Sequence, residues 1–164
     1  MAVINPSLHI GFLAADLSPK HGWAHYSLSL IEALSQLGVH LTVITARNSP
    51  LPTIPHARII PLLPDLELMQ RHLLARQLRA LPAARRILRD CHLIHSAAEP
   101  YAPIAALAAG SRPLIITGHG SYVRASQMRK PPVNQIYARA LKNSLLVRSE
   151  ERRVGEECRS RWSP

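Results

Sequence analysis

Short runs of aliphatic residues alternate with helical segments along most of the chain, and this alternation restricts the fold more than any other feature of the sequence. The first run, residues 9–13, is apolar enough for a buried strand. A helical pattern follows from Trp23, Gly38 then suits the left-handed backbone at a helix end, and residues 41–45 form a second aliphatic run. This order predicts a βαβ unit, which builds parallel sheets. The residues expected on the buried helix face are Leu30, Ile31, Leu34 and Leu37.

The alternation continues to residue 147. Five prolines interrupt residues 49–64, so residues 57–60 are expected to form only a short strand. Residues 66–88 have a helical pattern, in which Pro82 is expected to start a new helix rather than continue the old one. The predicted class is α/β, with an open, parallel, Rossmann-like sheet. Further strands are expected at residues 92–95, 113–117 and 144–147, and further helices at 101–109 and 133–141.

Composition fits a single globular domain with an aliphatic core. The chain has 164 residues, of which 47% are hydrophobic but only 4% aromatic. No apolar run approaches the roughly 20 residues of a membrane span, and residues 1–8 lack the basic start of a signal peptide. Cys91 and Cys158 form neither a disulfide framework nor a metal-ligand spacing. These features predict a cytoplasmic protein.

The net charge of +10 raises the question of a nucleic-acid partner. No aromatic residues are interleaved with the basic ones to stack bases, and no DNA-binding motif is present, so no nucleic-acid partner is expected. The charge gathers instead in a predicted basic helical pair, where arginines are interleaved with leucines. These arginines are Arg71, Arg76, Arg79, Arg85, Arg86 and Arg89.

The last 17 residues, 148–164, differ in character from the rest. They have no apolar periodicity, although they follow a strand that has barely begun, and they carry five of the 20 basic and four of the 10 acidic residues. The segment resembles the translation of a short-read sequencing adapter, with Glu156 where the usual peptide has Lys; a solvated charged tail is the alternative. We therefore expect a domain at residues 1–147, incomplete at its C-terminal end, and a non-native tail in which Cys158 and Trp162 have no meaning.

Ligands of open parallel sheets bind at the carboxyl ends of the strands, which here precede residues 14–22, 96–100 and 118–122. The first of these loops lacks GxGxxG, so a standard dinucleotide site is disfavoured. Gly22 opens a helix whose backbone N–H groups can meet a phosphate, although an ordinary helix-start glycine explains it equally well.

Gly118, His119 and Gly120 are the sharper signal. Two glycines at a strand end let the backbone approach a ligand closely while the imidazole points into the cleft; a capped loop histidine with no ligand is the alternative. His95 and Glu99 follow the preceding strand and are possible cleft residues. His95 is as well explained by a structural hydrogen bond, and Glu99 by a helix N-terminal acid.

In the order and spacing of these motifs, residues 8–147 resemble the N-terminal domain of glycosyltransferase family 4, one half of a GT-B fold. Residues 91–95 (CHLIH) match the family's Asp-Val-Ile-His-like strand, and residues 113–120 (PLIITGHG) match its Pro-Leu-Val-Thr-x-His-Gly strand end. Many members have a Gly-Gly pair in the first loop, whereas Trp23 follows Gly22 here. This departure puts phosphate contact at that position in doubt.

The resemblance implies retaining transfer of a sugar from a nucleotide-sugar donor to an acceptor, without a metal or other cofactor. It implies that His119 faces the transferred sugar as the catalytic candidate, and that Gly22 and Gly120 take part in substrate binding. By this resemblance, we expect the nucleotide-binding C-terminal domain of the parent enzyme to be missing from this chain. Because catalysis by oriented substrates needs both walls of the cleft, the chain alone is expected to be inactive.

The resemblance also suggests a peripheral contact between the basic helices and anionic membrane on the cytoplasmic face, since many members glycosylate lipids or polysaccharide precursors. A solvated basic face is the alternative. Two other functions are alternatives to the transferase hypothesis. One is a stand-alone Rossmann-like binding or interaction domain, and the other is a nucleotide-sugar epimerase or similar dinucleotide enzyme, which the missing glycine motif disfavours.

Overall fold

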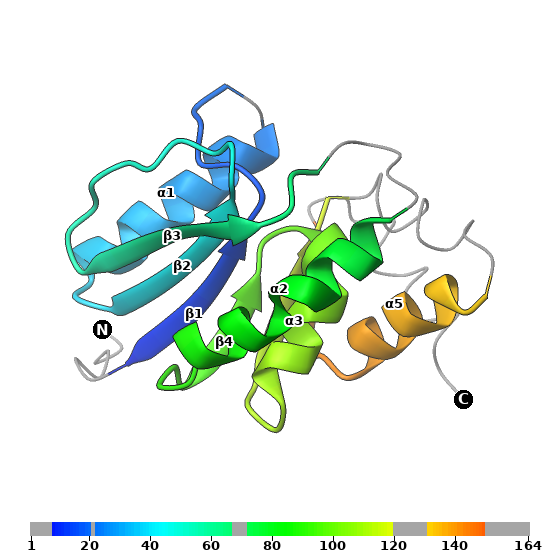
Figure 1. The fold of residues 1–164 in the computed structure, drawn as a ribbon. Coiled ribbons are helices and arrows are strands. Elements are labelled where there is room, and N and C mark those ends of the chain that lie inside the picture. Colours follow the sequence, from blue (N-terminus) through cyan, green and yellow to red (C-terminus); the bar gives the residue numbers. More distant parts are fainter. Residues whose placement is uncertain (1–7, 21, 67–71, 120–130, 150–164) are drawn as a thin grey trace.

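The computed structural model describes residues 8–20, 22–66, 72–119 and 131–149, which form a sheet covered by helices (Figure 1). This arrangement confirms the predicted α/β class. The strands are β1 (His9–Ala14), β2 (His40–Ala46), β3 (Ala57–Leu63), β4 (Leu93–Ser96), β5 (Leu114–Gly118) and β6 (Leu146–Ser149). The helices are α1 (Gly22–Gln36), α2 (Leu73–Ile87), α3 (Ala102–Ala109) and α5 (Val133–Lys142), with a short 3-10 turn η1 (Glu99–Tyr101).

The six strands pair in the order β3-β2-β1-β4-β5-β6, and every neighbouring pair is parallel. This is the strand order of dinucleotide-binding Rossmann sheets, so the predicted Rossmann-like fold is confirmed. The chain runs outward from β1 to β3 and then returns to place β4 on the other side of β1. The order therefore reverses between β1 and β4.

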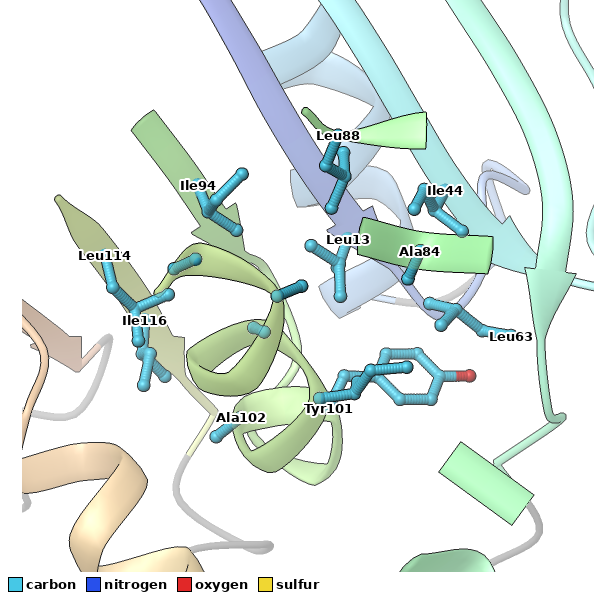
Figure 2. Packing of buried hydrophobic residues seen from close by; sticks show 14 of the residues in the cluster. Leu13, Ile44, Leu63, Ala84, Leu88, Ile94, Tyr101, Ala102, Leu114 and Ile116 are labelled. Atoms are coloured by element: carbon cyan, nitrogen blue, oxygen red, sulfur yellow. The ribbon is translucent and has the colours of Figure 1, made fainter. Parts of the chain in front are cut away.

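Each face of the sheet has its own apolar core. Alternate residues of β1 point to opposite sides, so that Phe12 packs with Ile31 of α1 and Leu13 packs with Ala84 of α2 and Ile104 of α3. Figure 1 shows α1 behind the sheet and α2 and α3 in front of it. Figure 2 shows the front core, in which the ring of Tyr101 belongs to the same cluster as the aliphatic side chains of Leu13 and Leu63. The predicted aliphatic core is present on both faces.

The buried face of α1 differs from the prediction, because it includes serine. Ile31 is fully buried as expected, but Leu37 follows the last helical residue and is 57% exposed. Ser27 and Ser35 are buried instead, and their hydroxyls donate to the carbonyls of Trp23 (3.0 Å) and Pro55. These hydrogen bonds satisfy the two hydroxyl groups away from water. Small side chains therefore share the helix–sheet contact with the larger aliphatic ones.

The prediction that Pro82 starts a new helix is wrong. Pro82 lies inside α2, which is continuous from Leu73 to Ile87. Proline removes the backbone hydrogen bond to the carbonyl four residues earlier, here Leu78. Both Pro82 and Leu78 are exposed, so the proline lies on the solvent side of the helix and not in the core. The predicted basic helical pair is thus one basic helix within the described residues.

The strand expected at residues 57–60 is longer than the prediction. β3 continues through Pro61 to Leu63 and pairs with β2 along this length, with a register irregularity at Thr45 and Ala46. β3 lies at the edge of the sheet. An edge strand tolerates proline, because the missing N–H can be the one that faces away from the partner.

The C-terminal boundary predicted at residue 147 falls inside β6. The backbone of Arg148 and Ser149 still pairs with Thr117 and Gly118 of β5. Residues 150–164 lie outside the described residues. The interpretation of 148–164 as a non-native tail therefore stays a prediction.

Arg112, just before β5, ties the ends of two helices together. Its guanidinium donates to the carbonyls of Leu88 and Cys91 after α2 and of Ala108 at the end of α3. Its Nε donates to the carbonyl of Ala109 at 3.0 Å. The last carbonyls of a helix have no partner within it and carry its negative dipole end. One cation therefore satisfies both helix ends.

Gly11, in the middle of β1, makes close packing against α2 and β4 possible. A Cβ added at Gly11 would lie 2.7 Å from Ile94 Cδ1, 2.8 Å from Leu88 Cδ2 and 3.2 Å from Cys91 Sγ. Ile94 and Leu88 are both fully buried. They occupy the space that any side chain at residue 11 would need.

Gly11→Ala is therefore expected to lower the free energy of unfolding by about 1–3 kcal/mol, the usual cost of overpacking a core. Urea denaturation of the whole chain measures this loss. Gly22→Ala is the matched control, because a Cβ at Gly22 meets nothing within 4 Å. A G11A variant as stable as the parent would show that the core accommodates a methyl group there.

Candidate functional site

The carboxyl ends of β1, β4 and β5 meet at the point where the strand order reverses. From β1 the chain passes to α1 on one face, whereas from β4 it passes through η1 to α3 on the other face. The two connections diverge and leave a crevice outside the strand ends, which is the ligand site of open α/β sheets. The N–H of Ala97 donates to the carbonyl of Leu13 at 2.9 Å and holds the two strands together at this point.

The loop after β1 is fixed by short polar contacts. Asp16 accepts hydrogen bonds from the N–H (2.9 Å) and the hydroxyl (2.6 Å) of Ser18, and the N–H of Leu17 donates to Ser49 Oγ at 2.9 Å. The loop leads to Gly22, which is exposed at the first position of α1. The predicted helix start at Gly22 is confirmed, and its binding role stays a prediction.

Glu99 and His119 make the central contact of the site. Glu99 is the first residue of η1 and only 3% exposed, and its Oε1 accepts a hydrogen bond from the backbone N–H of His119. A carboxylate bound to a backbone N–H makes a charge-assisted hydrogen bond. Two sequence-predicted site residues from neighbouring strand ends are thus brought together.

The imidazole of His119 is also held in place. Its Nε2 lies 2.8 Å from the carbonyl oxygen of Ala97, so Nε2 carries the proton and donates it. The ring packs edge-on against Tyr26 of α1, with centroids 5.6 Å apart and planes at 74°. His119 therefore joins α1 to the ends of β4 and β5 and is fixed at the crevice. Gly120 lies outside the described residues.

His95 lies within the sheet. It is 8% exposed in β4, its Nε2 is 2.9 Å from Thr117 Oγ1 of β5, and its ring packs edge-on against Phe12 of β1 at 4.7 Å. The side chain thus links three adjacent strands. His95 thus makes a structural hydrogen bond, which was one of the two roles considered for it from the sequence.

The carbonyl of Pro100 anchors the turn that carries Glu99. It accepts hydrogen bonds from Gln77 Nε2 of α2 at 2.6 Å and from the Tyr137 hydroxyl of α5 at 3.1 Å. The hydroxyl of Tyr101 donates to the carbonyl of Pro64 at 2.5 Å. These supports could not be predicted from the sequence, because nothing in a linear pattern shows that residues 77 and 137 meet at residue 100.

The arginines predicted to contact membrane are placed only in part. Arg71 lies outside the described residues, whereas the others are exposed on α2 or just after it. Arg85 Nε donates to the carbonyl of Leu107 at 3.0 Å, so this side chain is tied to α3. Among the residues that the structure describes, none of the helices has the length and apolar character of a transmembrane span. The membrane contact stays a prediction.

A second polar cluster, at the amino edge of the sheet, was not anticipated. His9, His40, His56 and His92 line an open pocket with Asp90 and Arg58. His9 Nε2 lies 2.8 Å from Thr42 Oγ1, and burial together with His40 and His92 lowers the pKa of His9 despite the opposing effect of Asp90. Among the described residues no three His, Cys, Asp or Glu side chains are grouped to hold a metal.

Cys91 lies beside this cluster and is buried. Its Sγ is 3.7 Å from His9 Nε2, and burial raises the pKa of the thiol to about 11, although Arg112 opposes the shift. A thiol with such a pKa is almost entirely protonated near neutral pH and is a poor nucleophile. Cys91 is therefore a core residue.

Comparison with known proteins decides the family. The model of glycosyltransferase family 4 matches residues 21–151, which is most of the chain. The chain belongs to glycosyltransferase family 4. A search of curated protein sequences finds no significant match. The family resemblance stated from the sequence motifs is confirmed.

Two solved structures share the fold of this family 4 chain. A sucrose-phosphate synthase from Thermosynechococcus elongatus aligns over 85% of this chain and 41% of its own, with a TM-score of 0.61 and 19% identity. Glycyrrhiza uralensis UGT73P12, complexed with glycyrrhetinic acid 3-O-monoglucuronide, aligns over 95% of this chain and 46% of its own, with a TM-score of 0.53 and 15% identity. The chain thus spans less than half the length of each.

The Glu99–His119 contact gives a prediction for the rigidity of the site. Glu99→Gln removes the charge from a buried hydrogen bond and is expected to lower the free energy of unfolding by about 1 kcal/mol. It is also expected to speed hydrogen exchange at the His119 amide, which NMR detects. Glu32→Gln, on the exposed face of α1, is the control. Equal protection of the His119 amide in both variants would contradict the assigned role.

The histidine cluster gives a prediction for pH dependence. The folded pKa of His9 is below 6.5, so the unfolded chain binds more protons and stability falls as pH drops below 6.5. His9→Gln is expected to reduce this loss between pH 7.5 and 5, as measured by thermal unfolding. His25→Gln, exposed on α1, serves as the control. An H9Q variant with the same pH profile as the parent would exclude His9 as the source.

Proposed function

We propose that this chain forms the acceptor-side wall of a retaining glycosyltransferase. The reaction is transfer of a sugar from a nucleotide-sugar donor to an acceptor, which is a lipid, a polysaccharide or a small molecule. Membership of family 4 supports the reaction class. The observation that carries the site is the contact between Glu99 and His119 at the crevice beside the strand-order reversal.

In this proposal His119 is the catalytic residue and faces the transferred sugar. Its backbone is fixed by Glu99, and its ring by Ala97 and Tyr26. Groups fixed before the substrate arrives need no reorganisation during the reaction, which is the main source of electrostatic catalysis. We also propose that Gly22 and Gly120 take part in substrate binding. Gly22 leaves open space where a side chain would stand.

The proposal places the nucleotide on a second domain. The two structures with the same fold are each more than twice as long as the part that aligns with this chain. Orientation of two substrates requires both walls of a cleft, so the chain alone is proposed to be inactive. We propose that the reaction needs no metal ion and that the enzyme lies on the cytoplasmic side.

Nucleotide release and transfer of labelled sugar test this proposal. The 164-residue chain, incubated with nucleotide-sugars and candidate acceptors, is expected to give no turnover. A longer product of the gene that includes a nucleotide-binding second domain is expected to be active. In that protein, His119→Ala is expected to lower kcat by about 100-fold, as for the loss of a preorganised polar group.

His25→Ala is the matched control, since His25 is exposed on α1. It is expected to leave kcat nearly unchanged. Turnover by the 164-residue chain alone would overturn the two-walled site. Full activity of the H119A enzyme would remove His119 from the mechanism.

A further inference from the structure

Polar side chains from three adjacent strands meet on the front face of the sheet at its amino edge. His9 of β1 pairs in register with His40 of β2, and Thr42 pairs with Arg58 of β3. Residues that pair across parallel strands, and residues two apart along one strand, point to the same face of a sheet. His9 Nε2 lies 2.8 Å from Thr42 Oγ1, as this rule requires. His9, His40 and Arg58 therefore point to the same side.

The turn before β3 and the loop before β4 each bring a further histidine to this edge. The ring of His56 packs edge-on against the ring of His40, with centroids 5.6 Å apart. The backbone N–H of His9 donates to His92 Nδ1 at 3.0 Å. This hydrogen bond requires that Nδ1 of His92 has no proton, so Nε2 of the neutral ring carries it and can donate. Four imidazoles are thus brought together by direct contacts and strand register.

These side chains line an open pocket of about 710 Å³, which we call the amino-edge pocket. Figure 1 shows no described helix in front of the amino ends of β2 and β3, and His40, His56 and Arg58 are exposed. A ligand can therefore enter from solvent. Pockets for small-molecule ligands have volumes of about 300–1,000 Å³, so the space is sufficient for one.

The charges around the amino-edge pocket favour an anion once its histidines are protonated. Arg58 carries a charge at every physiological pH, and Asp90 is the only acidic residue among the described lining residues. Burial, together with nearby His40 and His92, lowers the pKa of His9, although Asp90 opposes the shift. Without a ligand, imidazolium groups here repel one another. A bound anion offsets this repulsion and accepts hydrogen bonds from the imidazolium N–H groups.

A metal ion is the other ligand that grouped histidines suggest, and the geometry disfavours it. Among the residues that the structure places, no three His, Cys, Asp or Glu side chains are grouped to hold a metal. Cys91 Sγ lies 3.7 Å from His9 Nε2, but burial raises the pKa of the thiol to about 11. The thiolate that a metal needs is therefore scarce near neutral pH. Cys91 also adds no negative charge that would repel an anion.

We infer that the amino-edge pocket binds a tetrahedral oxyanion, sulfate or phosphate, together with protons taken up by its histidines. The oxyanion is either a free ion or the phosphate group of a small ester. Protonation and anion binding favour each other, so binding strengthens as pH falls through the ordinary pKa of histidine, about 6.5. The pocket lies at the edge of the sheet opposite to Glu99 and His119. This binding is independent of the proposed sugar transfer.

An NMR titration of the 164-residue chain with sodium sulfate, at pH 5.5 and 7.5 and constant ionic strength, tests the pocket. Sulfate keeps both negative charges over this pH range, so any pH dependence of its affinity comes from the protein. We expect saturable shifts at the amides of His9, His40 and Arg58. Binding is expected to be about tenfold tighter at pH 5.5, the equivalent of one added charge-assisted contact.

Two variants separate the permanent charge from the titrating one. Arg58→Gln is expected to weaken sulfate binding about tenfold at both pH values, whereas His40→Gln weakens it only at pH 5.5. Arg139→Gln on α5 and His25→Gln on α1 are the matched controls, because both residues are exposed and neither lines the pocket. The controls are expected to bind sulfate like the parent. Circular dichroism establishes that all variants are folded.

Glycerol phosphate, compared with inorganic phosphate at pH 5.5, distinguishes the two sources of the oxyanion. Tighter binding of the ester indicates a small phosphate ester, and equal or weaker binding indicates a free ion; either result supports the pocket. Absence of saturable shifts, equal sulfate affinity at the two pH values, or equal weakening by R58Q and R139Q would overturn it. The outcome of the transfer assay has no bearing on these results.

Discussion

The pairing of β1 with β4 is the contact on which the rest of the molecule depends. The connection after β1 leads to α1 on one face of the sheet, and the connection after β4 leads to α3 on the other face. This pair of strands therefore determines the position of both cores and of the crevice between the two connections. The pair packs closely because Gly11 has no side chain, and Ile94 and Leu88 fill the space above it. The Ala97 N–H then ties β4 to Leu13 at the very end of β1.

From this centre, the two edges of the sheet acquire different chemistry. The carboxyl edge gathers Glu99 and His119, and the turn that carries Glu99 is held by the hydrogen bonds of Pro100 and Tyr101. The amino edge gathers four histidines around an open pocket. The candidate site and the histidine cluster therefore lie at opposite ends of the same strands, because all strand ends of one kind meet at one edge of a parallel sheet.

The sequence predicted the strands well, because parallel strands are buried on both faces and show as aliphatic runs such as residues 41–45. The predictions from sequence were wrong where the outcome depended on which parts of a helix or strand are exposed to solvent. Pro82 continues α2 because its side of the helix is exposed, and Pro61 extends β3 because that strand is at an edge. Local sequence contains neither fact.

The candidate site was predictable as a set of strand ends, but not as a set of contacts. Glu99 and His119 were both expected near the crevice, yet only the fold shows that one binds the backbone of the other. Gln77 and Tyr137 support the turn from helices 23 and 37 residues away in sequence. No pattern in the sequence indicates such distant partners.

Arg112 changes how the charge of the molecule should be counted. Its guanidinium is occupied by carbonyls at the ends of α2 and α3, where it compensates two helix dipoles. An approaching anion therefore meets less positive potential than the formal sum suggests. A basic isoelectric point therefore reflects in part how the helices of such a fold are held together, and not only how the protein attracts its ligands.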